Sequence, residues 1–287
     1  TSMGYQMIEG TAISSITIPK NVSSCGYNSD NGPLANSKVL TTVIFEEGMT
    51  AIPSYILASD DYNSYVTNVQ IPDTVTKIGE RAFYKCSRLG NVTLPQKLTV
   101  IESSAFSGCE SIKEAAIGKN ITEIGSSAFE SCTGLESVTM SYNSIVEYTA
   151  SIGSNAFASC TSLVEVSLSE NVTSIGYQAF SGCSALESLT LPESLTYMGY
   201  GVIEGTEISS ITIPKNVSSC GTYGSAYGYS YRYDGPLSNS KVLTTVIFED
   251  GMKEIPSDIL ASGDYNSYVT DVQIPDTVTK IGERAFY

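Results

Sequence analysis

Residues 89–111 read LGNVTLPQKLTVIESSAFSGCES, and the sequence restarts the same pattern as soon as this stretch ends. The period is 23 residues, and it matches Leu89, Val92, Leu94, Leu98, Ile101, Phe106 and Cys109 with Ile112, Ala115, Ile117, Ile121, Ile124, Phe129 and Cys132. Self-similarity at this spacing indicates a solenoid, in which each unit buries its apolar face against its neighbours. The pattern therefore predicts stacked coils with one shared interior.

Each unit carries three local patterns. The LxxVxL segment alternates with the period of a β-strand, so Val92 and Leu94 are expected to point inward. Leu98 and Ile101 indicate a second, shorter extended segment. The SSAFSGC segment at 103–109 has apolar residues three and four apart, which predicts one or two helical turns. We expect an α/β repeat solenoid with a parallel β ladder, a second extended segment and a short helix or turn in each unit of about 23 residues.

A single solenoid domain is expected over residues 1–287, with about 11 units and a truncated unit at each end. Full units begin at Ile13, Leu40, Val66, Leu89, Ile112, Leu135, Leu163, Leu186, Ile208, Leu243 and Val269. A longer period overlies the short one, because ISSITIPKNVSSCG at 13–26 recurs 195 residues later at 208–221. Residues 1–87 and 196–287 are thus duplicated blocks, with eight residues added between Cys220 and Lys241.

The pattern Lxx(V/I)x(I/L)PxxVTxIGxxAFxxC resembles the BspA-like leucine-rich repeats, and VTNVQIPDTVTKIGERAFYKCSR at 66–88 is close to their consensus. The resemblance extends over nearly the whole chain. It implies a right-handed coil on exported surface proteins of bacteria and some protists, often associated with adhesion. It implies no catalytic residues. An extracellular or cell-surface location is therefore expected.

The net charge of the chain limits the classes of partner that it can bind. Thirty acidic residues against 15 basic ones give a formal charge of −15, which repels nucleic acid phosphates and anionic lipid headgroups. No apolar run approaches the roughly 20 residues that span a bilayer, so no direct membrane insertion is expected of this chain. An extracellular protein or glycan is the expected partner.

Neither enzyme chemistry nor a bound cofactor is indicated. The chain has no histidine, which removes the commonest general base and a frequent metal ligand. We therefore expect no catalytic residues, no metal site and no cofactor. The open alternative is calcium, for which the side chains of Asp60, Asp61 and Asn63, and of Asp264 and Asn266 in the later copy, offer oxygen ligands without EF-hand spacing. Five of the seven cysteines occupy one slot, three residues after the repeated phenylalanine, and are expected to be buried packing thiols: Cys86, Cys109, Cys132, Cys160 and Cys183.

An insertion after Cys220 is the first candidate for a binding site. It reads GTYGSAYGYSYRYDGP and carries Tyr223, Tyr227, Tyr229, Tyr231 and Tyr233 among glycine and serine. Rigid amphipathic rings on a flexible backbone are typical of adaptable recognition loops. The alternative is that these tyrosines cover core that the missing helical turn would leave exposed.

The outward strand positions form the second candidate. Most are small and neutral, and the residues we single out are Ile44, Gln70, Thr93, Ile247 and Gln273. A flat polar face with isolated isoleucines could bind a broad partner. The alternative is that serine and threonine merely keep an exposed sheet soluble. We expect a non-enzymatic surface recognition or adhesion solenoid, and its rival is a structural spacer within a longer repetitive protein.

Overall fold

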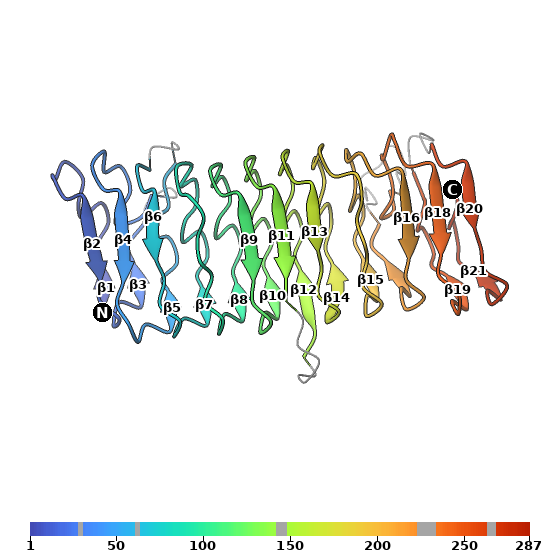
Figure 1. Ribbon diagram of the computed structural model, residues 1–287, viewed down its shortest axis with the longest axis horizontal. Coiled ribbons are helices and arrows are strands. Elements are labelled where there is room, and N and C mark those ends of the chain that lie inside the picture. Colours follow the sequence, from blue (N-terminus) through green and yellow to red (C-terminus); the bar gives the residue numbers. More distant parts are fainter. Residues whose placement is uncertain (28–30, 61–63, 142–147, 223–233, 263–267) are drawn as a thin grey trace, which may run out of the picture.

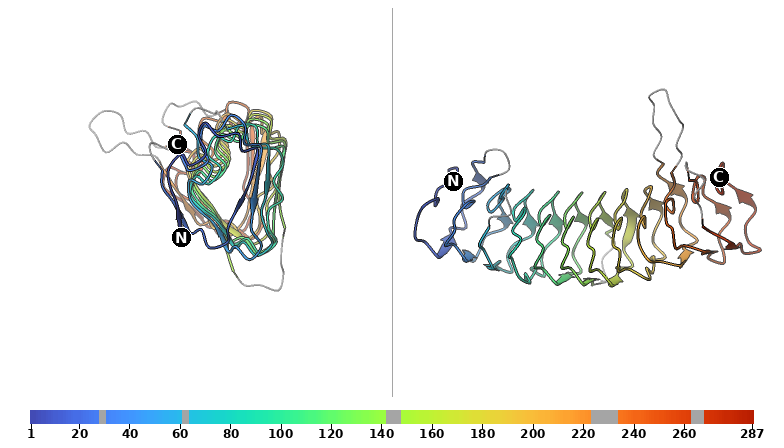
Figure 2. Two further views of the ribbon diagram at one scale, coloured as in Figure 1. Left: turned by 90° about the vertical axis from the view of Figure 1, so that its left-hand side faces the viewer. Right: turned by 90° about the horizontal axis from the view of Figure 1, so that it is seen from above.

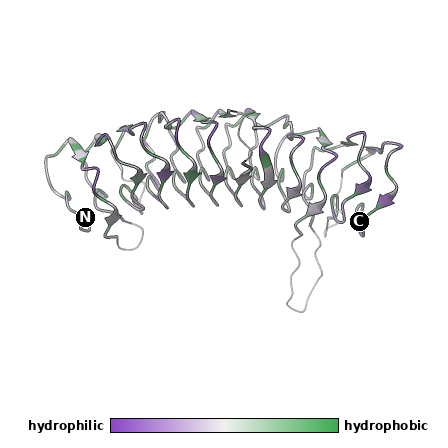
Figure 3. Cartoon of the chain, turned by 90° about the horizontal axis from the view of Figure 1, so that it is seen from below, coloured by the Kyte–Doolittle hydropathy of each residue, from purple (hydrophilic) through white to green (hydrophobic). Residues whose placement is uncertain are grey.

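The computed structural model describes residues 1–27, 31–60, 64–141, 148–222, 234–262 and 268–287. The chain forms an elongated, gently arched stack of coils (Figure 1; Figure 2, right). Viewed along the stack, the coils superimpose around a common interior (Figure 2, left). Hydrophilic and hydrophobic residues alternate along the chain over the length of the arch (Figure 3). The solenoid predicted from the 23-residue period is confirmed.

The first strands of the units pair in parallel with their neighbours except at two interruptions, and we call this the first ladder. It consists of three separate three-stranded sheets, in the orders β2-β4-β6, β9-β11-β13 and β16-β18-β20. The strands are β2 (Ser15–Ile18), β4 (Thr42–Phe45), β6 (Asn68–Gln70), β9 (Glu114–Ile117), β11 (Ser137–Met140), β13 (Glu165–Ser167), β16 (Ser210–Ile213), β18 (Thr245–Phe248) and β20 (Asp271–Gln273).

The second extended segments form a second ladder. It is an eight-stranded sheet in the order β17-β15-β14-β12-β10-β8-β7-β5, with the pairs β1-β3 and β19-β21 at its two ends. The strands are β1 (Ser2–Met3), β3 (Ser24–Cys25), β5 (Ala51–Ile52), β7 (Lys77–Ile78), β8 (Val100–Ile101), β10 (Glu123–Ile124), β12 (Ala150–Ile152), β14 (Val172–Ile175), β15 (Tyr197–Met198), β17 (Ser219–Cys220), β19 (Glu254–Ile255) and β21 (Lys280–Ile281).

The prediction of helical turns at the SSAFSGC segment is wrong, because this segment is a run of tight turns. Ser104 and Gly108 have φ of 55° and 74°, in the left-handed region that interrupts an α-helix. Phe106 N–H donates to the Ala128 carbonyl of the next coil at 2.8 Å, whereas Cys109 N–H closes a turn onto Phe106 at 3.1 Å. Alternate amides thus hold neighbouring coils together. Within the described residues, no helix is long and apolar enough to cross a membrane.

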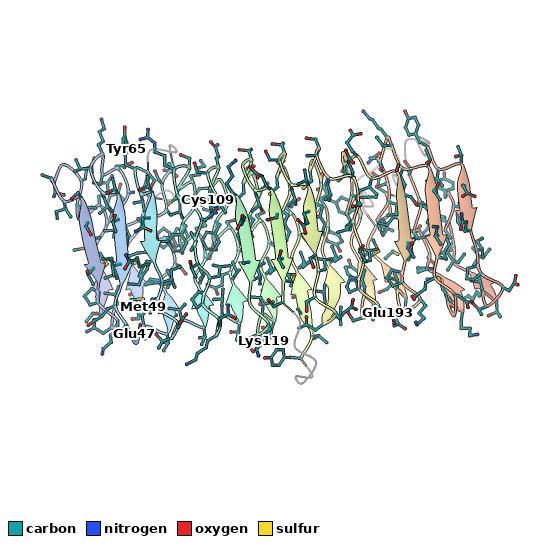
Figure 4. The ribbon with its side chains drawn as sticks, in the orientation of Figure 1. Glu47, Met49, Tyr65, Cys109, Lys119 and Glu193 are labelled. Carbon is teal, nitrogen blue, oxygen red and sulfur yellow. The ribbon has the colours of Figure 1, made fainter. Side chains whose placement is uncertain are left out.

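The interior contains a column of phenylalanine rings and a column of cysteines. Rings of Phe83, Phe106, Phe129, Phe157 and Phe180 are buried and nearly parallel, with centroids 5.0–5.4 Å apart. The five cysteines expected to be buried are buried free thiols, which confirms their packing role (Figure 4 labels Cys109). Cys109 Sγ also donates to the Phe83 carbonyl of the preceding coil at 3.1 Å. The thiol therefore satisfies a buried backbone acceptor as well as filling space.

Glycine in the repeated IG dipeptide sets how closely the coils approach. A Cβ placed on Gly125 would lie 2.6 Å from the Ser103 nitrogen of the preceding coil, and one on Gly176 would lie 2.5 Å from the Ser154 nitrogen. Such contacts are too short for any side chain. Pro53 takes the place of this glycine in one unit, and it has no N–H to donate back to β3, so the second ladder stops between β3 and β5. Pro256 repeats the break between β17 and β19.

The first ladder is interrupted in two units for which the sequence predicts a strand. Residues 91–94 and 188–191 are not assigned to a strand, although Leu94 and Leu191 still point into the core. The second ladder continues past both units, where β7 pairs with β8 and β14 pairs with β15. At these two units adjacent coils are therefore paired in the second ladder and lack strand pairing in the first.

Candidate strand-face surface and groove

The outward residues of the first ladder line up in rows across the coils. Thr17 faces Ile44 and Ile44 faces Gln70 in the register of β2, β4 and β6. The middle sheet aligns Thr139 with Ala116 and with Ser167. We call these aligned positions the outer row. The outer row is neutral and continuous within each sheet, whereas the neighbouring outward row carries the exposed acids Glu114, Glu165 and Asp271.

The two duplicated blocks carry the same outer row. Thr212 faces Ile247 and Ile247 faces Gln273, which repeats the Thr-Ile-Gln order of the first block. Both isoleucines are half-buried, while the glutamines beside them are exposed. We call these two groups the Thr-Ile-Gln patches. One molecule therefore presents two matching patches near its opposite ends.

Thr93 is exposed but lies outside both patches, in the interrupted unit. The five loop tyrosines, Tyr223, Tyr227, Tyr229, Tyr231 and Tyr233, lie outside the described residues. The outer row brings together Ile44 with Gln70 and Ile247 with Gln273, and it does not include Thr93.

Stacked tyrosines lie beside both insertion points, and the sequence reading missed them. Tyr27 stacks on Tyr55 with centroids 4.0 Å apart and planes 7° from parallel. Tyr177 stacks on Tyr200 at 5.0 Å, close to Gly221, where a Cβ would lie 2.5 Å from the Tyr177 ring. Spacing alone offers a weak signal for these pairs, because the partners are 23–28 residues apart in sequence. Exposed ring faces of this kind can stack on a planar or apolar ligand face.

A groove of about 310 Å³ opens at the second interruption of the first ladder, and the sequence reading missed this too. Residues 188–191 form one wall and residues 210–212 of β16 form the other, with Glu193, Pro214 and Glu249 at one end. Figure 4 shows Glu193 at the same edge of the stack as Glu47 and Lys119. A second groove, of about 290 Å³, lies between residues 20–23 and 50–54, where Pro53 ends the second ladder. Both grooves therefore coincide with missing ladder pairs.

None of the cysteines has the electrostatic surroundings of a nucleophile. Burial raises the pKa of Cys86 and Cys132 to about 12, and the pKa of the half-buried Cys25 and Cys220 is also raised to about 12 by burial. A reactive cysteine needs a lowered pKa. Among the described residues, no group of three or more His, Cys, Asp or Glu is placed to hold a metal ion.

Comparisons with known proteins match the chain to a repeat family and to solved repeat proteins of bacteria. It matches the BspA type leucine rich repeat region, in six copies, over residues 1–64, 61–151 and 150–287. A leucine-rich repeat protein from Bacteroides ovatus is 26% identical, with a TM-score of 0.63, and the alignment covers 95% of this chain and 72% of that one.

Two further solved structures are more distant. The leucine-rich repeat protein of T. pallidum is 25% identical with a TM-score of 0.49, over 60% of this chain and 78% of that one. A leucine-rich cell surface protein of Faecalibacterium prausnitzii is 19% identical with a TM-score of 0.40, over 96% and 83%. The comparison with curated proteins finds no match. Because the repeat family matches along essentially the whole sequence, the chain belongs to the BspA-type leucine-rich repeat family.

Proposed function

We propose that this chain is a non-enzymatic recognition solenoid of the cell surface that attaches to an extracellular protein or glycan. The observation that carries the proposal is the pair of Thr-Ile-Gln patches, in which Ile44 and Ile247 occupy the same position between a threonine and a glutamine. An apolar side chain surrounded by neutral hydrogen-bonding groups is suited to contact with a partner surface. The isoleucine can be buried away from water while the threonine and glutamine around it form hydrogen bonds with the partner.

Two matching patches favour attachment to a repetitive partner. Eight units separate Leu40 from Leu243 in sequence, and parallel strands lie about 4.8 Å apart, so the patches are about 38 Å apart. A partner that engages both patches gains avidity without any new contact. The stacked pairs Tyr27–Tyr55 and Tyr177–Tyr200 follow strands of the second ladder and are a separate candidate contact.

The first experiment immobilises the purified chain and measures its binding to extracellular-matrix proteins and a glycan array by biolayer interferometry. Replacing Ile44 or Ile247 by serine should weaken the affinity for a bound partner several-fold, and replacing both should remove the gain in avidity. Ala116→Ser is the matched control, since it changes the outer row of the middle sheet only. Absence of binding to any of these ligands, or equal binding by the double variant, would contradict the proposal.

The rival function is a structural spacer, and the long-period duplication favours it. A stalk grows by adding blocks of coils, and the block at 196–287 repeats that at 1–87. Replacing the five loop tyrosines by serine separates the two functions. If attachment persists in that variant while deletion of whole coils weakens it, the spacer function is supported.

A further inference from the structure

The groove beside β16 is bordered by a strand edge. β16 pairs with β18 and forms the edge of its sheet. Residues 188–191 of the preceding coil run alongside without a ladder, whereas the second ladder stays closed between these coils, where Met198 pairs with Cys220. The two coils are thus paired in the second ladder, and on the other side they are joined by the Glu207 N–H to Leu186 carbonyl bond at 2.9 Å but lack ladder pairs along residues 188–191.

Backbone groups of β16 point into this groove. The Ser209 and Ile213 carbonyls accept N–H groups of Thr245 and Glu249 from the next coil, at 3.2 and 3.0 Å. Alternate residues of a parallel strand direct their peptide groups to opposite sides, so Ser210 and Thr212 direct theirs toward the groove. An edge of this kind is a template for another extended chain.

The lining suits the side chains of an extended peptide. Leu189 and Leu191, 6% and 7% exposed, lie along one wall, and Ile211 lies along the other. Exposed hydroxyls of Ser188, Thr190, Ser210 and Thr212 line the rim. Successive side chains of a strand point to opposite faces, so one set meets the apolar residues and the other faces water.

Charge at one end of the groove selects a basic residue. Glu193 and Glu249 are the ionisable residues of the lining. Lys215 Nζ lies 3.3 Å from Glu193 and 3.6 Å from Glu249, so a single ammonium is shared by two carboxylates. One negative charge is left over, and a lysine or arginine of a partner would neutralise it.

The other interrupted unit carries a side-chain bridge to the next coil. Asn91 Oδ1 accepts N–H groups of Lys113 and Glu114 from the next coil, at 2.8 and 3.3 Å. This amide oxygen takes the place of a backbone carbonyl. Ser188 holds the equivalent position in the unit that begins at Leu186, and its shorter side chain makes no such bridge in the described structure. The difference between asparagine and serine thus separates the bridged interruption from the open one.

We propose that the groove between residues 188–191 and β16 binds an extended segment of a partner protein, which adds to the edge of β16 and places a lysine or arginine beside Glu193 and Glu249. The inference rests on the proposed recognition function and specifies a polypeptide as the partner at this site. Its ligand has alternating apolar and polar residues followed by a basic residue.

The probe is the acetylated and amidated peptide SITIPK, the sequence of residues 15–20, which forms a parallel strand in this fold. Titration into the ¹⁵N-labelled chain should shift the amide signals of Ser210 and Thr212 and protect them from hydrogen exchange. Two modified peptides test which edge of SITIPK pairs with β16. The first is N-methylated at both isoleucines and the second at the threonine, so each loses backbone N–H donors on a different edge. One of these two peptides should bind at least tenfold more weakly than SITIPK.

Ser188→Asn should close the groove and weaken SITIPK binding at least tenfold, with circular dichroism confirming an unchanged fold. Asn91→Ser is the matched control and should leave binding unchanged. Glu193→Gln together with Glu249→Gln should weaken binding and reduce its dependence on salt concentration.

The inference would be overturned if Ser188→Asn bound SITIPK as tightly as the unaltered chain does and both N-methylated peptides bound as tightly as SITIPK. It would also be overturned if SITIPK did not bind at all. If the chain still attaches to matrix proteins or glycans in that case, the recognition function stands without this site. If SITIPK binds as expected while the chain attaches to no matrix protein or glycan, the groove stands and the broader proposal fails.

Discussion

Phe129→Ala tests the continuous interior of the stack. The Phe129 ring is 2% exposed and lies between Phe106 and Phe157, with centroid distances of 5.1 and 5.4 Å and planes within 10°. Truncating a buried phenylalanine typically costs about 3–5 kcal/mol, because the lost apolar contact is joined by a residual cavity. That is a large part of the roughly 5–15 kcal/mol by which domains are stable.

A solenoid should respond locally, because each coil contacts only its neighbours. Loss of the Phe129 ring weakens the interfaces on both of its sides. Hydrogen exchange measured by mass spectrometry should therefore accelerate most between Phe106 and Phe157 and less toward the ends. Urea unfolding, followed by tyrosine fluorescence because the chain has no tryptophan, should begin at a lower urea concentration and separate into two steps as the halves uncouple.

Val164→Ala is the control, since Val164 is 56% exposed and its truncation should cost less than about 0.5 kcal/mol. A loss below about 1 kcal/mol for Phe129→Ala, with exchange unchanged around the substitution, would refute the reasoning, because a ring in a shared interior cannot be removed at so small a cost.

Three further predictions concern the coil contacts. Gly125→Ala should destabilise the chain by about 1–3 kcal/mol in urea unfolding, because its Cβ would lie 2.6 Å from backbone, whereas Gly90→Ala meets its nearest atom at 3.5 Å and should be tolerated. Pro53→Gly supplies the missing N–H and should produce an exchange-protected amide that closes β3 onto β5; an unprotected amide would argue against the proline explanation. Burial raises the pKa of three thiols of the cysteine column, those of Cys86, Cys132 and Cys183, from 9.0 to about 12. The unfolded chain therefore loses these protons at a lower pH than the folded chain, and the free energy of unfolding should fall as pH rises above about 9. A flat profile between pH 9 and 11 would contradict that burial.

The sequence predicts the stacking well because one period repeats both the apolar positions and the residues that fit between coils. Phe106 and Cys109 recur at fixed spacing, and both are fully buried. The helical turn fails for a physical reason. Spacings of three and four residues also arise from consecutive tight turns, and Ser104 and Gly108 adopt positive φ while alternate amides pair with the next coil.

The candidate site is less predictable from sequence. Outward positions such as Ile44 and Ile247 follow from strand alternation, and the structure aligns them in rows. The groove beside β16 exists because residues 188–191 form no strand pairs with β16. The repeat pattern predicts a strand at these residues and so does not predict the groove. Two local signals exist, proline in place of glycine at Pro53 and serine in place of asparagine at Ser188, and each is intelligible only once the partner atoms on the next coil are known.

The distance between Thr17 and Thr212 tests the stacking of coils most directly. Both residues are exposed at the same position of units that begin eight repeats apart, so coil stacking at about 4.8 Å predicts about 38 Å between their backbones. Spin labels attached to cysteines at these positions, in a Cys25→Ser and Cys220→Ser background, report this distance by double electron–electron resonance. A narrow distribution centred near 40 Å is the predicted result, and a broad distribution or a mean below about 25 Å would contradict a single stack of coils.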